Sequence, residues 1–270
     1  MPKQRIDLVM VQRGLAQSRE KAQAQIMAGN VWIEGRRVEK PSFPVDEQAP
    51  IDLREEPAFV SRGGYKLEKA LGSFQVPVQG RVAMDIGAAT GGFTDVLLQA
   101  GAMRVYAIDV GYGQLDWRLR NDPRVVVMER TNARYLKRDD FPIPPDLCVM
   151  DVSFISIELI LPAVMGIIGT GGRIVSLVKP QFEAGRENVG KKGVVRDPAV
   201  HEAVLRCIHA FIEVQGWCIQ GIDYSPITGP EGNIEFLMDA VIRDGARERV
   251  TPEGVSGIVT QAHEHFLKKR

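Results

Sequence analysis

The chain has 270 residues, of which 44% are hydrophobic and 25% charged, the composition of an ordinary globular protein. Its 34 basic and 34 acidic residues cancel, so no global field indicates a nucleic-acid partner. No window approaches the roughly 20 apolar residues of a membrane helix, and the N-terminus lacks a signal peptide's apolar core, so we expect a cytoplasmic protein. The three cysteines, Cys148, Cys207 and Cys218, have no paired spacing, which excludes a zinc site or disulfide framework and predicts buried thiols.

The first 45 residues form a small basic block, with eight Lys or Arg and four Asp or Glu. Apolar periodicity predicts a helix over 5–14, and Ser18 is a good N-cap for a second helix over 19–28. Two short β segments around Glu34-Gly35 predict a hairpin over 31–41. We expect residues 1–60 to form a binding module and a linker, because Pro57 interrupts the structure before the next helix.

From about residue 80, strands alternate with helices. This order predicts an α/β domain over 61–270, with a mostly parallel sheet covered on both faces. The last two β runs have no helix between them and are expected to pair antiparallel at one edge. The predicted strands are 81–87, 104–111, 124–129, 147–154, 172–180, 217–227 and 233–242, and the predicted helices are 93–101, 158–168, 197–216 and 254–270.

The stretch "MDIGAATGGFTD" joins the first of these strands to a helix through a glycine-rich turn. The turn is built on Gly87, Gly91 and Gly92, and its spacing is not the G-x-G-x-x-G of a dinucleotide cradle. Asp85 beside it would repel a phosphate and attract a cation such as S-adenosylmethionine. Asp109 ends the second strand, where an acid accepts hydrogen bonds from ribose hydroxyls. The alternative is an ordinary tight turn that Asp85 caps.

Two further strands end in charged residues, Asp151 and Lys179, and both ends are expected to open on one crevice. Glu235 lies in an apolar β run, where a charge needs a partner, and Lys66 precedes the first helix of the domain. A Lys-Asp-Lys-Glu cluster suits methylation of a ribose 2′-hydroxyl, which must lose its proton as it attacks. Lys179 would be the base, and Asp151 would orient Lys179 and the hydroxyl. Lys66 would lower the pKa of Lys179 and position the substrate, and Glu235 would hold Lys66 or the ribose. The alternative is that each is a solvated or capping residue, and Lys69 is a rival for Lys66.

Five blocks, "SRGGYKL", "GAATGGFTD", "MDVSFISI", "LVKPQFE" and "GPEGNIEF", together resemble the TlyA family of ribosomal RNA 2′-O-methyltransferases, often labelled hemolysin A. The N-terminal stretch resembles an S4 RNA-binding domain of α+β structure, and the remainder resembles an FtsJ-like class I methyltransferase domain with a Rossmann-like sheet. The resemblance implies catalytic roles for Lys66, Asp151, Lys179 and Glu235. It implies that S-adenosylmethionine contacts a set of loop and strand-end residues: Asp85, Gly87, Gly91, Gly92, Asp109 and Asn132, the last near the adenine. Ala89 stands where the family commonly has Ser, which would weaken at most one cofactor contact.

The resemblance also implies a cytidine in small-subunit ribosomal RNA, and sometimes also in large-subunit RNA, as the target. Large-subunit activity is not expected, because the chain starts almost at the S4 motif. We expect the basic block to bind RNA phosphates through Arg13, Arg19, Lys21, Arg36 and Arg37. The basic segment 185–197 would line the substrate entrance or form a solvated loop.

Two other functions compete with methyl transfer. A membrane-active hemolysin is disfavoured, because the chain shows neither a span nor a strongly amphipathic basic helix. A non-catalytic ribosome-binding factor on the same scaffold would bind RNA without modifying it.

Overall fold

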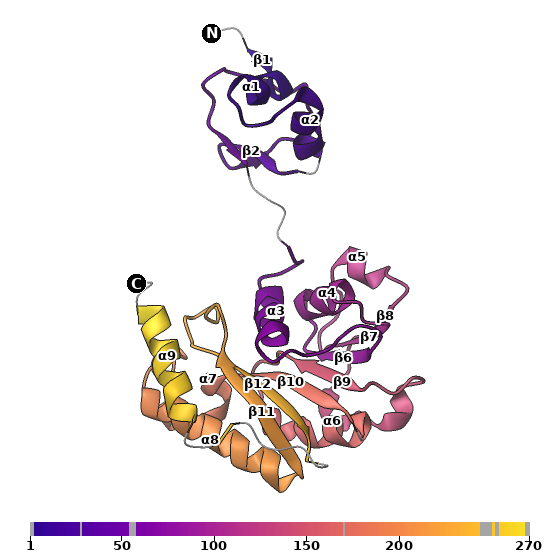
Figure 1. Ribbon diagram of the computed structural model, residues 1–270, viewed down its shortest axis with the longest axis vertical. Coiled ribbons are helices and arrows are strands. Elements are labelled where there is room, and N and C mark those ends of the chain that lie inside the picture. The colour runs from indigo at the N-terminus through magenta and orange to yellow at the C-terminus, as the bar shows by residue number, and fades with distance from the viewer. Residues whose placement is uncertain are drawn as a thin grey trace. The chain divides into compact units, whose positions relative to one another are not determined.

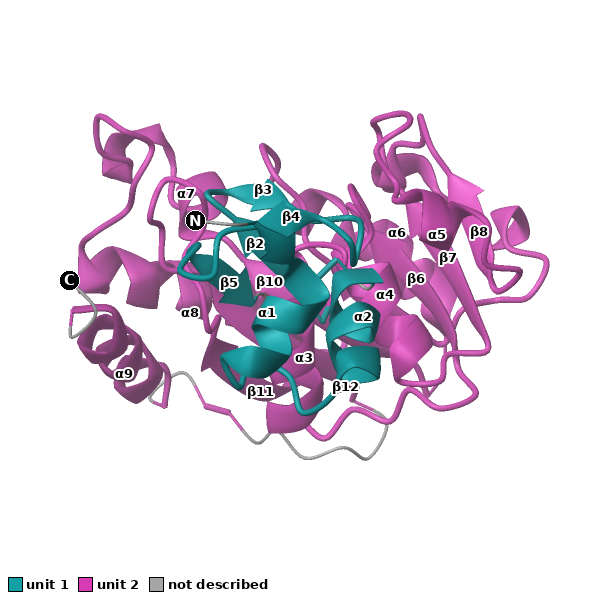
Figure 2. Cartoon of the chain, turned by 90° about the horizontal axis from the view of Figure 1, so that it is seen from above, with its two compact units in different colours: residues 1–58 teal, residues 59–270 magenta. Residues whose placement is uncertain are grey.

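The computed structural model describes residues 3–27, 29–53, 58–169, 171–243, 250–251 and 254–267. The chain divides into two compact units, Met1–Ala58 and Phe59–Arg270 (Figure 2). Phe59 is buried in the core of the second unit, and the Val60 amide donates to Asp95 at 2.9 Å, so the second unit starts two residues before the predicted boundary. The linker residues 54–57, residue 28 of the second predicted helix, and residues 268–270 of the last lie outside the described residues.

The first unit contains the two helices and the hairpin predicted for it. Helices α1 (Ile6–Gln12) and α2 (Arg19–Met27) precede strands β2 (Val31–Ile33) and β3 (Arg36–Arg37). Two pairings were not predicted, because strands of two or three residues carry no readable alternation: β5 (Ile51–Leu53) pairs with β2, and β1 (Gln4–Arg5) with β4 (Pro44–Val45). The core of the unit is apolar and consists of Ile6, Val9, Met10, Ala22, Ile26, Val31, Val38 and Val45.

The second unit is built on a seven-stranded sheet with the order β11-β12-β10-β9-β6-β7-β8 (Figure 1). Strands β6 (Val82–Ile86), β7 (Arg104–Ile108), β8 (Val125–Met128), β9 (Leu147–Met150) and β10 (Arg173–Val178) are parallel. Strand β12 (Phe236–Ile242) runs antiparallel to β10, and β11 (Trp217–Tyr224) pairs with β12 at the edge. The predicted parallel sheet with an antiparallel edge is therefore confirmed.

Helices cover both faces of this sheet (Figure 1). Helices α3 (Gly63–Ser73), α4 (Gly92–Gln99) and α5 (Trp117–Arg120) share one apolar core, and α6 (Leu161–Ile168), α8 (Pro198–Val214) and α9 (Val255–Leu267) share the other. The side chains of β6 alternate between these cores, as strand geometry requires: Met84 belongs to one core and Ala83 to the other. Short helical turns complete the unit: α7 (Pro180–Glu183), η1 (Ala133–Tyr135), η2 (Arg138–Asp140), η3 (Ile157–Leu159) and η4 (Arg186–Asn188).

One cysteine departs from the prediction. Cys148 and Cys218 are buried, but Cys207 is exposed. It lies on α8 between the buried residues Leu205 and Ile208, on the outer side of the helix, so apolar neighbours in the sequence do not imply burial at this position. Within the described ranges, no helix combines the length and the hydropathy that a bilayer span requires.

Candidate active site

Three strand ends converge at one edge of the large sheet. Because β9 and β10 are parallel neighbours, the residues that follow them, Asp151 and Lys179, lie at the same edge. Strand β12 runs the opposite way and starts beside the end of β10, since Phe236 pairs with Val178. Glu235, which directly precedes β12, is thereby delivered to this edge from the last quarter of the chain.

The side chains at this edge form a connected ionic cluster with Lys66 of α3. Lys179 Nζ lies 2.6 Å from Asp151 Oδ1 as an ion pair. Lys66 Nζ donates to Glu235 Oε2 at 2.6 Å and to Asp151 Oδ2 at 3.4 Å. The structure thus brings together all four residues of the predicted Lys-Asp-Lys-Glu cluster. The rival Lys69 is turned away, because its Nζ pairs with Asp223 Oδ1 at 2.9 Å.

The cluster is balanced in charge and largely shielded from solvent. Lys66 is 7% exposed and Glu235 1% exposed. Burial lowers the pKa of Lys66, but the carboxylates of Asp151 and Glu235 more than offset this, so the pKa is raised and Lys66 remains an ammonium. Glu235 pairs with Lys66, and Asp151 bridges the side chains of the two lysines.

A cavity of about 360 Å³ opens above this cluster. Its lining includes the four charged side chains together with Gly87, Gly92 and Phe93 of the glycine-rich loop and the start of α4. Gly87 has φ +83°, and a Cβ there would lie 2.5 Å from the Asp151 carbonyl oxygen. Only glycine allows this backbone to come so close to the strand end that carries Asp151.

Some of the residues predicted to bind the cofactor line the cavity, and others shape the loop around it. Gly87 and Gly92 line the cavity. Gly91, with φ +96°, is the N-cap residue of α4 and lies against Leu119. Asp109 holds the loop from the next strand, because its carboxylate accepts the amides of Ala89 at 2.8 Å and Gly111 at 2.7 Å. Each of its oxygens retains a lone pair for a ribose hydroxyl.

One of these residues is placed differently from the prediction. Asp85 is fully buried beneath the loop and accepts a hydrogen bond from Thr94 Oγ1 at 2.7 Å. Burial raises its pKa to about 7. The prediction that Asp85 contacts a cationic cofactor directly is therefore wrong. Asp85 instead stabilises the glycine-rich loop from beneath. Asn132 is exposed, and its Oδ1 caps a short helical turn by accepting the Arg134 amide at 3.1 Å.

The cavity residues form a group that fits S-adenosylmethionine. The loop offers close-approaching backbone, Asp109 offers a carboxylate at the next strand end, and the cluster offers acids near a sulfonium. The close approach of this loop to the start of α3 supports this fit, since a Cβ on Gly92 would lie 2.9 Å from the Gly64 amide nitrogen.

Two residues near the cluster were missed by the sequence analysis. Ser153 Oγ accepts a hydrogen bond from Lys179 Nζ at 2.9 Å and fixes the lysine from a second side. Phe154 is 92% exposed and has φ +64°, which is unusual for an aromatic residue. The block "MDVSFISI" includes this segment, but only the folded structure shows that Ser153, and not a neighbouring residue, contacts Lys179.

The five cations predicted to bind RNA phosphates are all exposed in the first unit. Arg13 and Arg19 already form hydrogen bonds within the unit. Arg13 Nη1 donates to the Ala49 carbonyl at 2.6 Å, and Arg19 Nε donates to the buried carboxylate of Asp7 at 3.0 Å. Arg37 lies over Gly29. Lys21 and Arg36 form no ion pair with any residue in the described part of the chain.

Comparison with known proteins places these features in a class. Residues 59–240 match the FtsJ-like methyltransferase family, and residues 4–51 match the S4 domain. The fold and the cleft therefore define a two-unit enzyme, an S-adenosylmethionine-dependent methyltransferase joined to an S4 domain.

Three relatives narrow the class. "Putative rRNA methyltransferase YqxC" of Bacillus subtilis is 48% identical over 99% of this chain and 97% of its own. "16S/23S rRNA (cytidine-2'-O)-methyltransferase TlyA" of Mycobacterium tuberculosis is 47% identical over 87% of this chain and 88% of its own. The structure titled "Putative hemolysin from Streptococcus thermophilus" is 47% identical, with a TM-score of 0.77 over 100% of this chain and 98% of that one. The chain belongs to the TlyA family.

Proposed function

We propose that this enzyme transfers a methyl group from S-adenosylmethionine to the ribose 2′-hydroxyl of a cytidine in ribosomal RNA, with small-subunit RNA as the expected substrate. The observation that carries the proposal is the charged cluster on the wall of the cavity, where Lys66, Asp151, Lys179 and Glu235 are linked by contacts of 2.6–3.4 Å. The proposed substrate implies a cytoplasmic enzyme.

The M. tuberculosis relative, whose name specifies cytidine 2′-O-methylation of 16S and 23S RNA, supports the substrate. The S4 domain supports RNA as the partner. Of the five cations predicted to bind RNA, Lys21 and Arg36 form no ion pair with the described residues and can contact phosphates. Beside the cluster, the exposed ring of Phe154 offers a surface on which an unpaired base can stack.

When bound, S-adenosylmethionine supplies an activated methyl group on a sulfonium, which leaves as a neutral thioether. The chain's own residues provide position and proton transfer. The 2′-hydroxyl lies at Lys179 Nζ, and this lysine, in its neutral amine form, accepts the hydroxyl proton as the new carbon–oxygen bond forms. Asp151 and Ser153 hold that nitrogen in place, at 2.6 and 2.9 Å. Lys66, held as an ammonium by Glu235, keeps the Asp151 carboxylate oriented.

Methyl transfer to ribosomal subunits that lack the modification tests this proposal. Labelled S-adenosylmethionine and both subunits are incubated with the full chain, and the methylated nucleotide is mapped by mass spectrometry. We expect a 2′-O-methylated cytidine, and a rate for Lys179→Ala that is lower by a factor of about 100 or more. Cofactor binding, measured by calorimetry, should change little in that variant.

Lys69→Ala is the matched control, because Lys69 lies one turn from Lys66 but pairs with Asp223 outside the cluster. It should retain the rate of the unmodified enzyme. Retained transfer in Lys179→Ala would contradict the assigned base. A methyl group on the nucleobase would contradict the proposed atom. RNA binding without any transfer would identify a non-catalytic ribosome-binding factor instead.

A further inference from the structure

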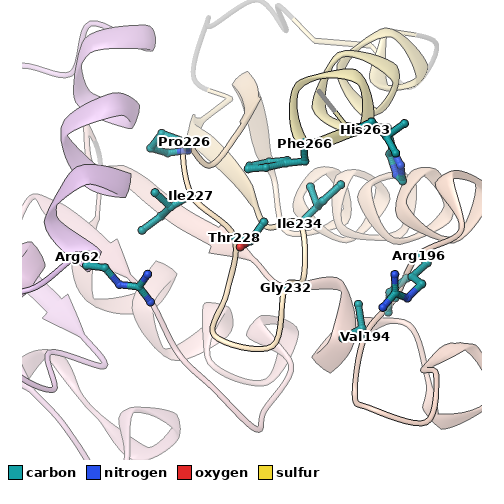
Figure 3. Close-up of a pocket in the computed structure, with 12 residues that line it drawn as sticks. Arg62, Val194, Arg196, Pro226, Ile227, Thr228, Gly232, Ile234, His263 and Phe266 are labelled. Atoms are coloured by element: carbon teal, nitrogen blue, oxygen red, sulfur yellow. The ribbon is translucent and has the colours of Figure 1, made fainter. Parts of the chain in front are cut away.

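A second and larger cavity, of about 580 Å³, adjoins the catalytic cavity in the second unit (Figure 3). The two cavities share Arg62, Ile227 and Thr228 in their linings. None of the glycine-loop residues lines the larger cavity. An occupant of this cavity would therefore be continuous with the substrate in the catalytic cavity, and separate from the methyl donor.

The lining of this cavity is apolar with a cationic rim. Pro226, Ile227 and Ile234 form one side, and Figure 3 shows Phe266 extending from α9 toward them. Arg62 and Arg196 lie on opposite sides of the opening in the same view. An apolar slot of this size, flanked by cations, suits a planar heteroaromatic group that carries negative charge.

Among the described residues, the two arginines at the rim of this cavity have no carboxylate partner. None of the twelve residues that line the cavity is acidic. Neither Arg62 nor Arg196 forms an ion pair or a side-chain hydrogen bond with a residue in the described ranges. The neighbouring carboxylate of Asp197 caps α8 by accepting the Ala199 amide at 2.9 Å. Two guanidinium groups beside an apolar slot favour an anionic ligand over an apolar peptide.

The cationic surface continues away from the catalytic cavity. A third cavity, of about 410 Å³, shares Val194 and Arg196 with the second and is also lined by Lys191 and Lys192. The three cavities therefore form a series, from the charged cluster, through the apolar slot, to a group of lysines. A flexible chain with one phosphate per unit matches this order of chemistry.

We propose that the second cavity binds the base of a nucleotide adjacent to the methylated one in the same RNA strand. This inference rests on the proposed function. The base stacks on Phe266 and packs against Ile227 and Ile234, and the flanking phosphates pair with Arg62 and Arg196. The enzyme thereby requires an unpaired strand on that side of its target, because a base inside a duplex cannot enter the slot.

Replacement of Phe266 measures this subsite. Stacking of one base on an aromatic ring accounts for a roughly tenfold change in affinity or more, so Phe266→Ala should raise the KM for RNA by about tenfold. The KM for S-adenosylmethionine should not change, because the loop that lines the cofactor wall is separate. Phe266→Tyr keeps an aromatic ring, so its KM for RNA should equal that of the unmodified enzyme. Val214→Ala is the control, since Val214 is 83% exposed at the end of α8 and lines none of these cavities.

Phe266 also contacts Tyr224 and His265 at ring-centroid distances of 6.3 and 4.9 Å, so its truncation can loosen α9. A photo-crosslink avoids truncation: p-benzoylphenylalanine replaces Phe266 in the full chain, which is irradiated on ribosomal subunits with S-adenosylhomocysteine. Primer extension should map the crosslink within about two nucleotides of the methylated one, and the same replacement of Val214 should give none there.

A crosslink to a distant nucleotide, to a ribosomal protein, or to nothing would overturn the subsite. An unchanged KM for RNA in a folded Phe266→Ala protein would do the same. The methylation assay on the same subunits separates the two proposals. Loss of the subsite with methylation intact refutes only the cavity assignment, whereas absence of methylation by the unmodified enzyme refutes the proposed function.

Discussion

The buried ion pair between Lys66 and Glu235 should make these two residues strongly dependent on each other for stability. Their charged atoms lie 2.6 Å apart, which corresponds to about 6 kcal/mol of attraction at an effective dielectric constant of about 20. Much of this attraction is offset by desolvation of both groups. Removing one partner leaves the other charge buried, and that typically costs about 3–5 kcal/mol.

We expect Lys66→Met to reach that range, because Glu235 is only 1% exposed and would lose its closest cation. Glu235→Leu should cost less, because Lys66 retains Asp151 at 3.4 Å. The double variant replaces two opposite charges with two apolar side chains of similar size. It should lie within about 2 kcal/mol of the unmodified protein, giving a coupling energy of roughly 3 kcal/mol.

Urea unfolding followed by amide hydrogen exchange in β10 and β12 measures this coupling, since those strands report the second unit alone. All three variants should lose methyl transfer. The double variant should therefore be nearly as stable as the unmodified protein and yet inactive. Additive losses, with a coupling energy near zero, would show that the ion pair contributes nothing and would refute the electrostatic reasoning.

Three further predictions concern other parts of the chain. Gly87→Ala should destabilise the protein by about 2 kcal/mol or more and weaken cofactor binding, because it adds a clash with the Asp151 carbonyl to the strain of φ +83°. Gly80→Ala, with φ +75° and open space around its Cβ, should cost only the strain; urea unfolding and calorimetry compare the two, and equal effects would refute the clash.

Asp85 has a folded-state pKa of about 7, above its unfolded value, so the folded state binds the extra proton and loses stability as pH rises from about 4 through 7. Relative to Asp85→Asn, the unmodified protein should lose about 2–3 kcal/mol between pH 5 and pH 8, and parallel pH profiles of the two proteins would contradict this. In the first unit, Lys21→Ala and Arg36→Ala should each lower the slope of log affinity against log salt for RNA by about 1, without changing the unfolding midpoint; an unchanged slope would exclude a phosphate contact.

The Asp85 comparison requires the variant as its reference, because a second buried group opposes it. His201 has its pKa lowered to about 4, mainly by burial. Its contribution to stability is present above its unfolded pKa of about 6.5 and is lost as pH falls toward 4. The stability curve of the unmodified protein therefore contains two opposite slopes in the same pH range, and only the difference between proteins isolates Asp85.

The charged cluster was predictable because its geometry follows from topology. Parallel strands end at one edge, so Asp151 and Lys179 had to be neighbours once their strands were assigned. The pairing of β12 with β10 then placed Glu235 opposite Lys179. For Lys66, only the family resemblance selected it over Lys69, since both lie on one helix and the packing of α3 decides which side chain faces the cluster.

The features that the sequence did not predict also have definite physical causes. Asp85 alternates with Met84 along β6, so its side chain points into the layer between the sheet and α4, where Thr94 meets it. The motif alone suggested a residue that contacts the cofactor. The hydrogen bonds of Arg13 to Ala49 and of Arg19 to Asp7 were not predicted, because in the sequence both residues resemble any other exposed cation. Their binding to RNA phosphates stays a prediction.

The late arrival of Glu235 has a consequence during synthesis of the chain. Lys66 and Glu235 are 169 positions apart, and β12 must insert between β10 and β11 before they meet. A nascent chain that has emerged only as far as Lys179 holds the glycine loop, Asp151 and Lys179, yet its Lys66 lacks its main counter-charge, Glu235. The four-residue charged cluster is therefore completed only in the final stage of translation, and a polypeptide that ends before β12 lacks Glu235.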